Sequence, residues 1–266
     1  MPVVRREDGA EIWWDADGPE DAPAVLMVMG LAYPADMFHR IIPLLAKKHR
    51  VIRSDNRGAG YTGDVVGAPY TVETMAADSL AVLTAAGYET ADVFGISMGG
   101  LIAQEIALSA PDRVRTLILG CTHPGTADAI FSPEALELLG SRDGMTVAEA
   151  AEVSIPFNYA PGTSRATIEE DWAIRIPLGA SPQGYLNQLT GASMWKGLPR
   201  TRGIAIPTLI VHGELDALVP LANGEKLAGI IPGSELVVIP DANHVFFTDQ
   251  PERTAEILLE WLGRPR

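Results

Sequence analysis

Short apolar runs alternate with amphipathic stretches along most of the chain. Six of these runs are aliphatic or β-branched and nearly continuous: Val25–Met29, Val51–Arg53, Val93–Ile96, Leu117–Leu119, Leu209–Val211 and Leu236–Ile239. Runs of this kind are typical of strands that a parallel sheet buries on both faces. Because helical stretches separate the runs, the pattern predicts an α/β fold with a mostly parallel, doubly wound sheet.

Three helices are well marked between and after these strands. Thr71 is an N-cap residue for a helix that runs to about Ala86. The segment Leu101–Ala110 is apolar nearly all round, which predicts a buried helix. A last helix is expected from about Pro251 to Leu262, with its apolar residues on one side.

The alternation of strands and helices breaks in two places. Val3–Arg6 and Glu11–Trp14 flank Asp8-Gly9, which predicts an antiparallel hairpin at one edge of the sheet. Residues 123–200 contain no strand-like run. Their helical pieces are Pro133–Leu139, Val147–Val153, Ala166–Ile174 and Tyr185–Gln188. We therefore expect a core domain of residues 1–122 and 201–266, with residues 123–200 inserted as a helical cap, or lid.

Composition and charge narrow the classes of partner. The chain has 266 residues, 34 of them acidic and 20 basic, and its formal net charge is -14. A surface this acidic repels phosphate groups, so we expect neither a nucleic-acid nor a membrane partner. The single cysteine, Cys121, excludes an intramolecular disulfide and favours a cytoplasmic location. The N-terminus lacks the apolar stretch of a signal peptide. Nothing in the sequence indicates an oligomeric state.

The strongest chemical signal is the sequence Gly-Ile-Ser-Met-Gly-Gly at residues 95–100, which follows one predicted strand and opens the buried helix. A serine hydroxyl is a weak nucleophile that must be held clear of the strand, against a base. A tight strand-to-helix turn does this, and glycines relieve its crowding. The helix N-terminus also offers N–H groups to a developing oxyanion. This context predicts that Ser97 is a nucleophile.

Such a nucleophile needs a base, and the chain has five histidines. His39 and His49 lie in charged segments that predict surface positions, and His212 ends a strand, where a core or edge position is expected. His123 follows a strand and can line a site, but its setting specifies no role. His244 lies on the loop after the final strand, at the sheet edge that also carries the serine. Ligands of open α/β sheets bind at that edge, so we infer that His244 is the general base.

The carboxylate that orients the base is expected between the serine and the histidine in sequence. Glu214 and Asp216 both follow the strand Leu209–Val211 and reach the same sheet edge. Either could accept the imidazole Nδ1–H and fix its tautomer.

Together these motifs resemble those of the α/β-hydrolase superfamily. The matching stretches are Gly95–Gly100, Gly213–Asp216 with Val219-Pro220, and Asn243-His244. Val28–Leu31 stands where the family keeps its first oxyanion loop, and Asp55–Gly60 is similar to the family's Asp-x-Arg-Gly-x-Gly turn. The resemblance covers the chain from about Val25 to Trp261.

The resemblance implies an α/β-hydrolase fold and a triad of Ser97, Asp216 and His244. It also implies an oxyanion hole made by the backbone N–H groups of Leu31 and Met98. The implied activity is serine-dependent hydrolysis of a small-molecule carboxylic ester or lactone through an acyl-enzyme. The family implies no metal and no organic cofactor.

Within the superfamily, Pro69-Tyr70-Thr71 leading to the serine motif is most similar to the 3-oxoadipate enol-lactonase group and neighbouring carboxylesterases, including polyketide methylesterases. Two departures matter. Met29-Gly30 stands where many members have His-Gly, so the loop keeps the backbone donor of the next residue but loses the polar contact of a histidine. No Trp follows His244, which argues against the carbon–carbon hydrolase branch. A serine in place of aspartate argues against epoxide hydrolase and haloalkane dehalogenase chemistry. Carbon–carbon hydrolysis, perhydrolysis or acyl transfer on the same triad, and ligand binding with little turnover, are the alternatives.

Bulky side chains of the cap are predicted to line the substrate pocket. We name Phe157, Trp172, Met194 and Trp195 for this role. As a group they favour an uncharged or partly apolar acyl group over a polyanion.

Overall fold

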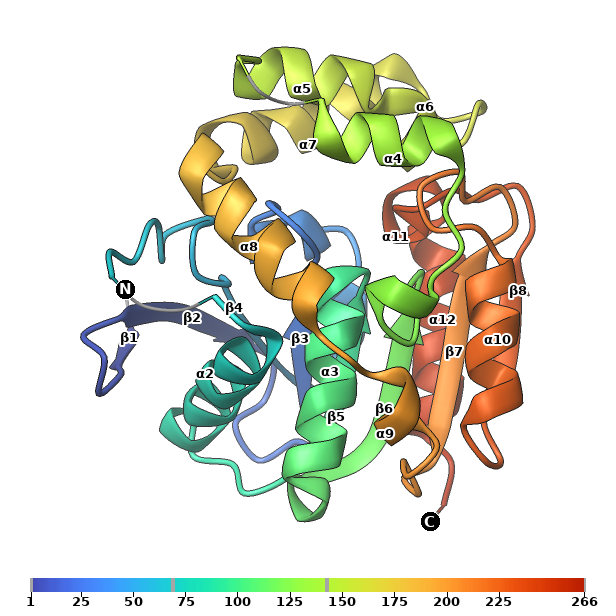
Figure 1. Ribbon diagram of the computed structural model, residues 1–266. Coiled ribbons are helices and arrows are strands. Elements are labelled where there is room, and N and C mark those ends of the chain that lie inside the picture. The colour runs from blue at the N-terminus through green and yellow to red at the C-terminus, as the bar shows by residue number, and fades with distance from the viewer. Residues whose placement is uncertain (1, 68–69, 142–143, 266) are drawn as a thin grey trace.

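The computed structural model describes residues 2–67, 70–141 and 144–265 (Figure 1). Pro69, part of the motif that precedes the helix capped by Thr71, lies outside these residues. The strands are β1 (Val3–Arg5), β2 (Glu11–Asp17), β3 (Ala24–Val28), β4 (Arg50–Ser54), β5 (Ala91–Ile96), β6 (Val114–Gly120), β7 (Thr208–Gly213) and β8 (Glu235–Ile239). The α-helices are α1 (Ile42–Leu45), α2 (Val72–Ala85), α3 (Met98–Ser109), α4 (Pro133–Gly140), α5 (Val147–Val153), α6 (Ile155–Asn158), α7 (Arg165–Leu178), α8 (Pro182–Met194), α9 (Leu198–Thr201), α10 (Ala222–Ile230), α11 (Phe246–Asp249) and α12 (Pro251–Leu262). Short 3₁₀ turns are η1 (Ala35–Phe38), η2 (Pro111–Arg113) and η3 (Thr126–Asp128).

The strands form one sheet in the order β1-β2-β4-β3-β5-β6-β7-β8. β1 pairs with β2, and β2 with β4, in antiparallel register. Every pair from β4 to β8 is parallel. This confirms the mostly parallel sheet and the hairpin at its edge. Because the parallel strands point the same way, the loops that follow β3, β5, β6, β7 and β8 gather at one edge of the sheet.

Alternating side chains of the central strands enter two separate apolar layers. Leu26 and Val28 of β3 pack with α2 and α3, whereas Val25 and Met27 pack with α1 and α12 on the other face. Because helices cover both faces of the sheet, the side chains on either face of a central strand are buried. This explains the unbroken apolar runs. Figure 1 shows helices on both sides of the sheet.

The expectation of burial on both faces is wrong for β8. Leu236, Val237 and Val238 are only half-buried, because β8 is the last strand of the sheet and has a neighbour on one side only. Helix α2 follows its prediction closely, with the Thr71 hydroxyl accepting a hydrogen bond from the Thr74 N–H (3.1 Å). In the described part of the chain, no helix has the length and apolar character needed to cross a bilayer.

Helices α4 to α9 all come between β6 and β7 in the chain. Figure 1 shows α4, α5, α6 and α7 grouped at one end of the molecule, with α8 descending from them toward α3. The four predicted helical pieces correspond to α4, α5, α7 and α8, and α7 and α8 are longer than expected.

A buried arginine joins distant parts of the core domain. The Arg57 side chain is 1% exposed and donates two hydrogen bonds to the Asp78 carboxylate, from Nε (2.5 Å) and Nη2 (2.9 Å). Its Nη1 donates to Asp8 in the β1–β2 turn (2.6 Å), and this bond lowers the pKa of the Asp8 carboxyl. The backbone carbonyl of Arg57 accepts from Gln188 of α8 (2.6 Å).

We expect Arg57→Met to lower the free energy of unfolding by about 3–5 kcal/mol, because it leaves the Asp78 carboxylate buried beside a single partner, Arg6. Urea denaturation followed by circular dichroism measures the change. Arg253→Gln is the matched control, since Arg253 pairs with Glu256 in solvent, and its midpoint should stay close to that of the wild type. Equal midpoints for both variants would contradict the structural role of Arg57.

Candidate active site

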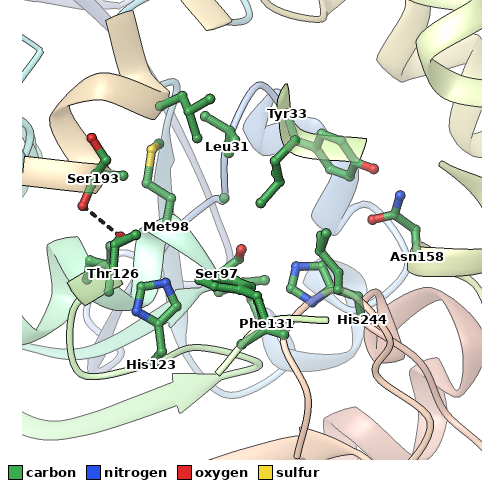
Figure 2. A pocket seen from close by; sticks show the side chains of 18 of the residues that line it. Leu31, Tyr33, Ser97, Met98, His123, Thr126, Phe131, Asn158, Ser193 and His244 are labelled. Atoms are coloured by element: carbon green, nitrogen blue, oxygen red, sulfur yellow. Dashed lines mark hydrogen bonds between the residues drawn. The ribbon is translucent and has the colours of Figure 1, made fainter. Parts of the chain in front are cut away.

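Ser97 occupies the turn between β5 and α3. Its backbone has φ 56° and ψ −120°, a conformation that a residue with a side chain rarely adopts. The turn ends β5 at Ile96 and starts α3 at Met98, so the serine side chain leaves the sheet edge without being covered by either element. Figure 2 shows Ser97 at the centre of a cavity, with His244 on one side and His123 on the other.

Two glycines make this turn possible by letting the backbones approach closely. A Cβ on Gly95 would lie 2.1 Å from the Gly99 carbonyl oxygen, and a Cβ on Gly99 would lie 2.1 Å from the Val28 carbonyl oxygen. No side chain fits at these distances, so the first turn of α3 packs directly against β3. The sequence argument from Gly-x-Ser-x-Gly rests on this crowding.

His244 lies on the loop between β8 and α11 and is 5% exposed. Its Nδ1 donates to Asp216 Oδ2 (2.8 Å). The other carboxylate oxygen of Asp216 accepts from the backbone N–H groups of Leu218 (3.0 Å) and Val219 (2.7 Å). These bonds fix the carboxylate and leave Nε2 of His244 as the free ring nitrogen, the atom that a general base uses.

Glu214, the other candidate for the acid, is placed differently. It is exposed, and its carboxylate accepts from the backbone N–H of Asp241 (3.3 Å). Asp216 is buried and contacts the imidazole. The two carboxylates are only two residues apart in sequence, yet one of them faces solvent.

Asn243 fixes the loop that carries His244. Its side-chain oxygen accepts from the backbone N–H groups of His244 (2.9 Å) and Ala217 (3.2 Å), which ties the histidine loop to the acid loop. Its amide group donates to the carbonyls of Pro156 within α6 (3.1 Å) and of Tyr159 just after it (2.9 Å). The loop is thereby also anchored to the helical segment.

The loop after β3 brings a second backbone segment to the serine. A Cβ on Gly30 would lie 3.1 Å from Ser97 Cβ, so this loop passes directly over the turn. Leu31 follows, and both Leu31 and Met98 line the cavity that holds Ser97. Among the residues that the structure describes, the backbone N–H groups of Leu31 and Met98 have no hydrogen-bond partner. Two N–H groups left free beside a serine are what an oxyanion hole requires.

A glutamine of α8 holds this loop in place. Gln188 is fully buried, and its side-chain oxygen accepts from the Ala32 N–H (2.7 Å) while its amide donates to the Arg57 carbonyl (2.6 Å). Ala32 has a positive φ of 65°. A single side chain from the helical segment therefore supports a strained residue next to Leu31, a contact that the sequence pattern did not indicate.

The cavity around Ser97 has a volume of about 440 Å³ and is lined by both parts of the chain. Core elements contribute Ser97, Met98 and His244, and α4 and α8 contribute apolar side chains. The apolar lining residues include Leu31, Leu101, Leu136, Leu139, Leu189, Leu218 and Phe247. A second apolar cavity of about 310 Å³ shares Leu139, Gly140 and Leu189 with it.

The sequence prediction of the pocket lining is wrong, because none of Phe157, Trp172, Met194 and Trp195 lines the cavity around Ser97. Trp195 is buried, but its indole N–H donates to Glu105 of α3 (2.9 Å), which holds the ring against the core helix. Met194 ends α8 and is 70% exposed.

Phe157 and Trp172 pack in apolar clusters outside this cavity. Phe157 joins a small apolar cluster with Leu138 and Leu218. Trp172 packs against the apolar layer that contains α1 and α12, and the Arg165 guanidinium lies 4.5 Å from its ring. Bulk and apolarity thus selected side chains that pack elsewhere or face solvent. The spacing of the apolar residues along α4 and α8 would have been the better signal for the lining.

The other histidines have distinct environments. His212 is fully buried, as expected for a core position, and its Nε2 lies 2.7 Å from the Val219 carbonyl and 3.5 Å from Asp216 Oδ2. Burial lowers its pKa, so it is neutral. His49 is also buried, contrary to the expected surface position, and His39 lies near Asp171 of α7 (3.8 Å). His123 lines the cavity around Ser97.

Comparison with known proteins agrees with this geometry. The family model described as alpha/beta hydrolase fold matches residues 23–251. BpoC of Mycobacterium tuberculosis, provisionally named a non-heme bromoperoxidase, is 31% identical over 235 residues, which are 85% of this chain and 87% of BpoC. 3-Oxoadipate enol-lactonase 1 of Acinetobacter baylyi is 28% identical, over 96% of this chain and 94% of its own.

A solved structure adds a likeness in three dimensions. The thermophilic esterase from Thermogutta terrifontis, solved with malate bound, is 29% identical, with a TM-score of 0.85 over 98% of each chain. The relatives carry the names of several different hydrolases and of a bromoperoxidase, so they support the family and the hydrolase class more firmly than any one substrate. Because the family model matches most of the chain, the protein is a member of the alpha/beta hydrolase fold family.

Proposed function

We propose that this protein hydrolyses a small-molecule carboxylic ester or lactone through an acyl-enzyme on Ser97. The observation that carries the proposal is the strained Ser97 turn, which opens into the same cavity as a histidine oriented by a buried aspartate. In this proposal His244 is the general base, Asp216 orients it, and the N–H groups of Leu31 and Met98 bind the oxyanion.

The reaction proceeds in two acyl-transfer steps. His244 Nε2 takes the Ser97 hydroxyl proton as the serine oxygen attacks the substrate carbonyl. The carbonyl oxygen becomes an oxyanion held by the two backbone N–H groups, and Asp216 stabilises the imidazolium. When the carbonyl re-forms, the bond to the alcohol oxygen breaks and His244 returns the proton to that oxygen. Water then attacks the acyl-enzyme by the same route and releases the acid.

The choice of an ester or lactone rests on the cavity and on the relatives. The lining is mainly apolar and holds no lysine or arginine among the described residues, which suits an uncharged acyl group. The enol-lactonase and the esterase named above open or cleave a carboxylic ester bond, as their names state.

We propose that residues 123–200 form the lid that sets substrate range. Leu136 and Leu139 of α4 and Leu189 of α8 line the cavity opposite the core elements. Gln188 and Asn158 of the same segment bond to the loops after β3 and β8. Changes in this segment therefore reach both the pocket and the loops that hold the reacting groups.

Perhydrolysis is the second candidate. BpoC is named a bromoperoxidase, and a peroxidase uses hydrogen peroxide, the acceptor that perhydrolysis requires. In that reaction hydrogen peroxide replaces water in the second step, and the acyl-enzyme releases a peracid. The two candidates share the acyl-enzyme and differ in its acceptor. Product analysis with hydrogen peroxide or an added alcohol present would separate hydrolysis from perhydrolysis and from acyl transfer.

Ser97→Ala should lower turnover of p-nitrophenyl esters by roughly a thousandfold or more while the fold is retained, because no other group forms the acyl-enzyme. Release of p-nitrophenol from the acetate-to-decanoate series measures the rate and gives the chain length that the cavity accepts. Ser109→Ala at the far end of α3 is the control, since its hydroxyl only bonds the Glu105 carbonyl (2.7 Å). Near-wild-type turnover by Ser97→Ala would show that the nucleophile is wrongly assigned.

Asp216→Asn should reduce kcat by about a thousandfold to ten-thousandfold, because an amide can hold the imidazole in the wrong tautomer and cannot stabilise the imidazolium. Glu214→Gln should change kcat by less than about twofold, since Glu214 is exposed and contacts the Asp241 backbone instead. Steady-state kinetics on one ester compares the two variants directly. If Glu214→Gln were the more damaging change, the acid would have to be reassigned.

A further inference from the structure

His123 is a cavity residue that the proposed mechanism does not use. It lies on the loop after β6, is only 6% exposed, and lines the cavity together with Ser97 and His244. Figure 2 shows the two histidines on opposite sides of the serine. The His123 ring packs edge-on against Phe131, with 5.4 Å between the ring centroids. The imidazole is thus held in a fixed orientation at the wall.

One ring nitrogen of His123 is already engaged by the backbone. The Gly125 N–H donates to Nδ1 (3.2 Å), so Nδ1 is an acceptor and carries no proton. Burial lowers the pKa of His123 to about 4, and the ring is therefore neutral at physiological pH. A neutral imidazole with an unprotonated Nδ1 carries its proton on Nε2.

The Nε2–H group is a donor without an acceptor. In the described part of the chain, no hydrogen-bond partner of this nitrogen is present. Thr126 and Ser193 lie on the same side of the cavity in Figure 2, but their hydroxyls donate to the carbonyls of Ala192 (3.1 Å) and Thr190 (2.8 Å). A donor on a largely buried side chain that lines a cavity can be satisfied only by water or by a ligand in that cavity. His123 therefore offers this wall a hydrogen bond that a bound molecule can take.

The proposed mechanism decides which part of a substrate faces His123. The leaving oxygen receives its proton from His244 and so lies on that side of Ser97. An acyl chain that extends away from the leaving oxygen would therefore run toward the opposite side of Ser97, where Figure 2 shows His123. On the basis of the proposed function, we infer that Nε2–H of His123 donates to an oxygen on the acyl chain, and that the preferred substrates are esters or lactones of oxygen-substituted acids.

The chemistry of the wall selects an uncharged oxygen. The described lining of this cavity contains no lysine or arginine that could balance a carboxylate, and a neutral imidazole donor carries no net charge. A keto, hydroxyl or ether oxygen accepts one hydrogen bond there without bringing a buried charge. Alkyl acyl chains of the same length leave the donor unpaired.

The test compares ethyl hexanoate with ethyl 3-oxo-, 4-oxo- and 5-oxohexanoate, using the wild type, His123→Phe and His123→Gln. Acid release in a pH-stat gives kcat/KM for each protein with each ester. Within each protein, dividing kcat/KM of an oxo ester by kcat/KM of ethyl hexanoate cancels any general effect of the substitution on Ser97 chemistry. Comparing this oxo-to-alkyl ratio between proteins cancels the intrinsic reactivity of each ester. For the oxo ester that the wild type prefers most, the oxo-to-alkyl ratio should fall about tenfold in His123→Phe. It should largely return in His123→Gln, whose amide restores a donor.

An unchanged ratio in His123→Phe, or equal losses on both members of the pair, would overturn the inference and leave His123 with a packing role. If His123→Phe does not fold, His123→Leu gives the same comparison.

A binding measurement separates this inference from the proposed function. Calorimetric titration of the preferred oxo ester and of ethyl hexanoate into Ser97→Ala, with and without His123→Phe, needs no turnover. The oxo ester should bind Ser97→Ala more tightly than the alkyl ester, and His123→Phe should remove about tenfold of that preference. If the wild type hydrolyses no ester but this preference is present, the proposed function fails and the His123 site stands. If the wild type hydrolyses esters but Ser97→Ala shows no preference for the oxo ester, the proposed function stands and the His123 site fails.

Discussion

The close approach of α3 to β3 is the constraint on which the rest of the site depends. With Gly99 packed against the Val28 carbonyl, the helix can begin immediately after β5, and Ser97 must take up a positive φ to connect them. The same approach places the first N–H of the helix beside the loop that follows β3. One packing contact thus exposes the serine and brings the backbones of Met98 and Leu31 to the same cavity, so the proposed nucleophile and the proposed oxyanion hole have a common physical cause.

The helical segment does more than cover the cavity. Gln188 holds the loop after β3, while the Asn158 carbonyl accepts from the Val245 N–H (2.9 Å) beside His244. Asn243 adds two bonds in the opposite direction, from the histidine loop to the Pro156 and Tyr159 carbonyls. Backbone groups that would otherwise need water are satisfied by this helical segment, which restricts the loops after β3 and β8. If the segment is the lid that we propose, the same helices couple substrate range to the alignment of the proposed reacting groups.

Sequence patterns predicted those features that depend on neighbouring residues. The strands, the cap of α2 and the Ser97 turn follow from periodicity and local sterics, and all have the expected places. The cavity lining could not be predicted this way, because it depends on long-range contacts. Trp195 resembles a pocket residue in sequence, but its N–H donates to Glu105, ninety positions away in the chain, and this bond holds the ring against α3. The Arg57–Asp78 pair and the half-buried β8 likewise depend on strand order and long-range contacts, which a single sequence does not display.

Three buried histidines show how hydrogen bonding assigns different chemistry to one side chain. His212 also lies near Asp216, but its Nε2 contacts the Val219 carbonyl, it is not among the described lining residues of the cavity, and burial keeps the ring neutral. His123 has its Nδ1 occupied by a backbone N–H, which leaves a donor at the wall. His244 has its Nδ1 bonded to a carboxylate, which leaves Nε2 as an acceptor, the atom that acts as the base in the proposed mechanism. For the two histidines of this cavity, the partner of Nδ1 thus determines whether Nε2 donates or accepts, which separates the proposed substrate contact from the proposed general base.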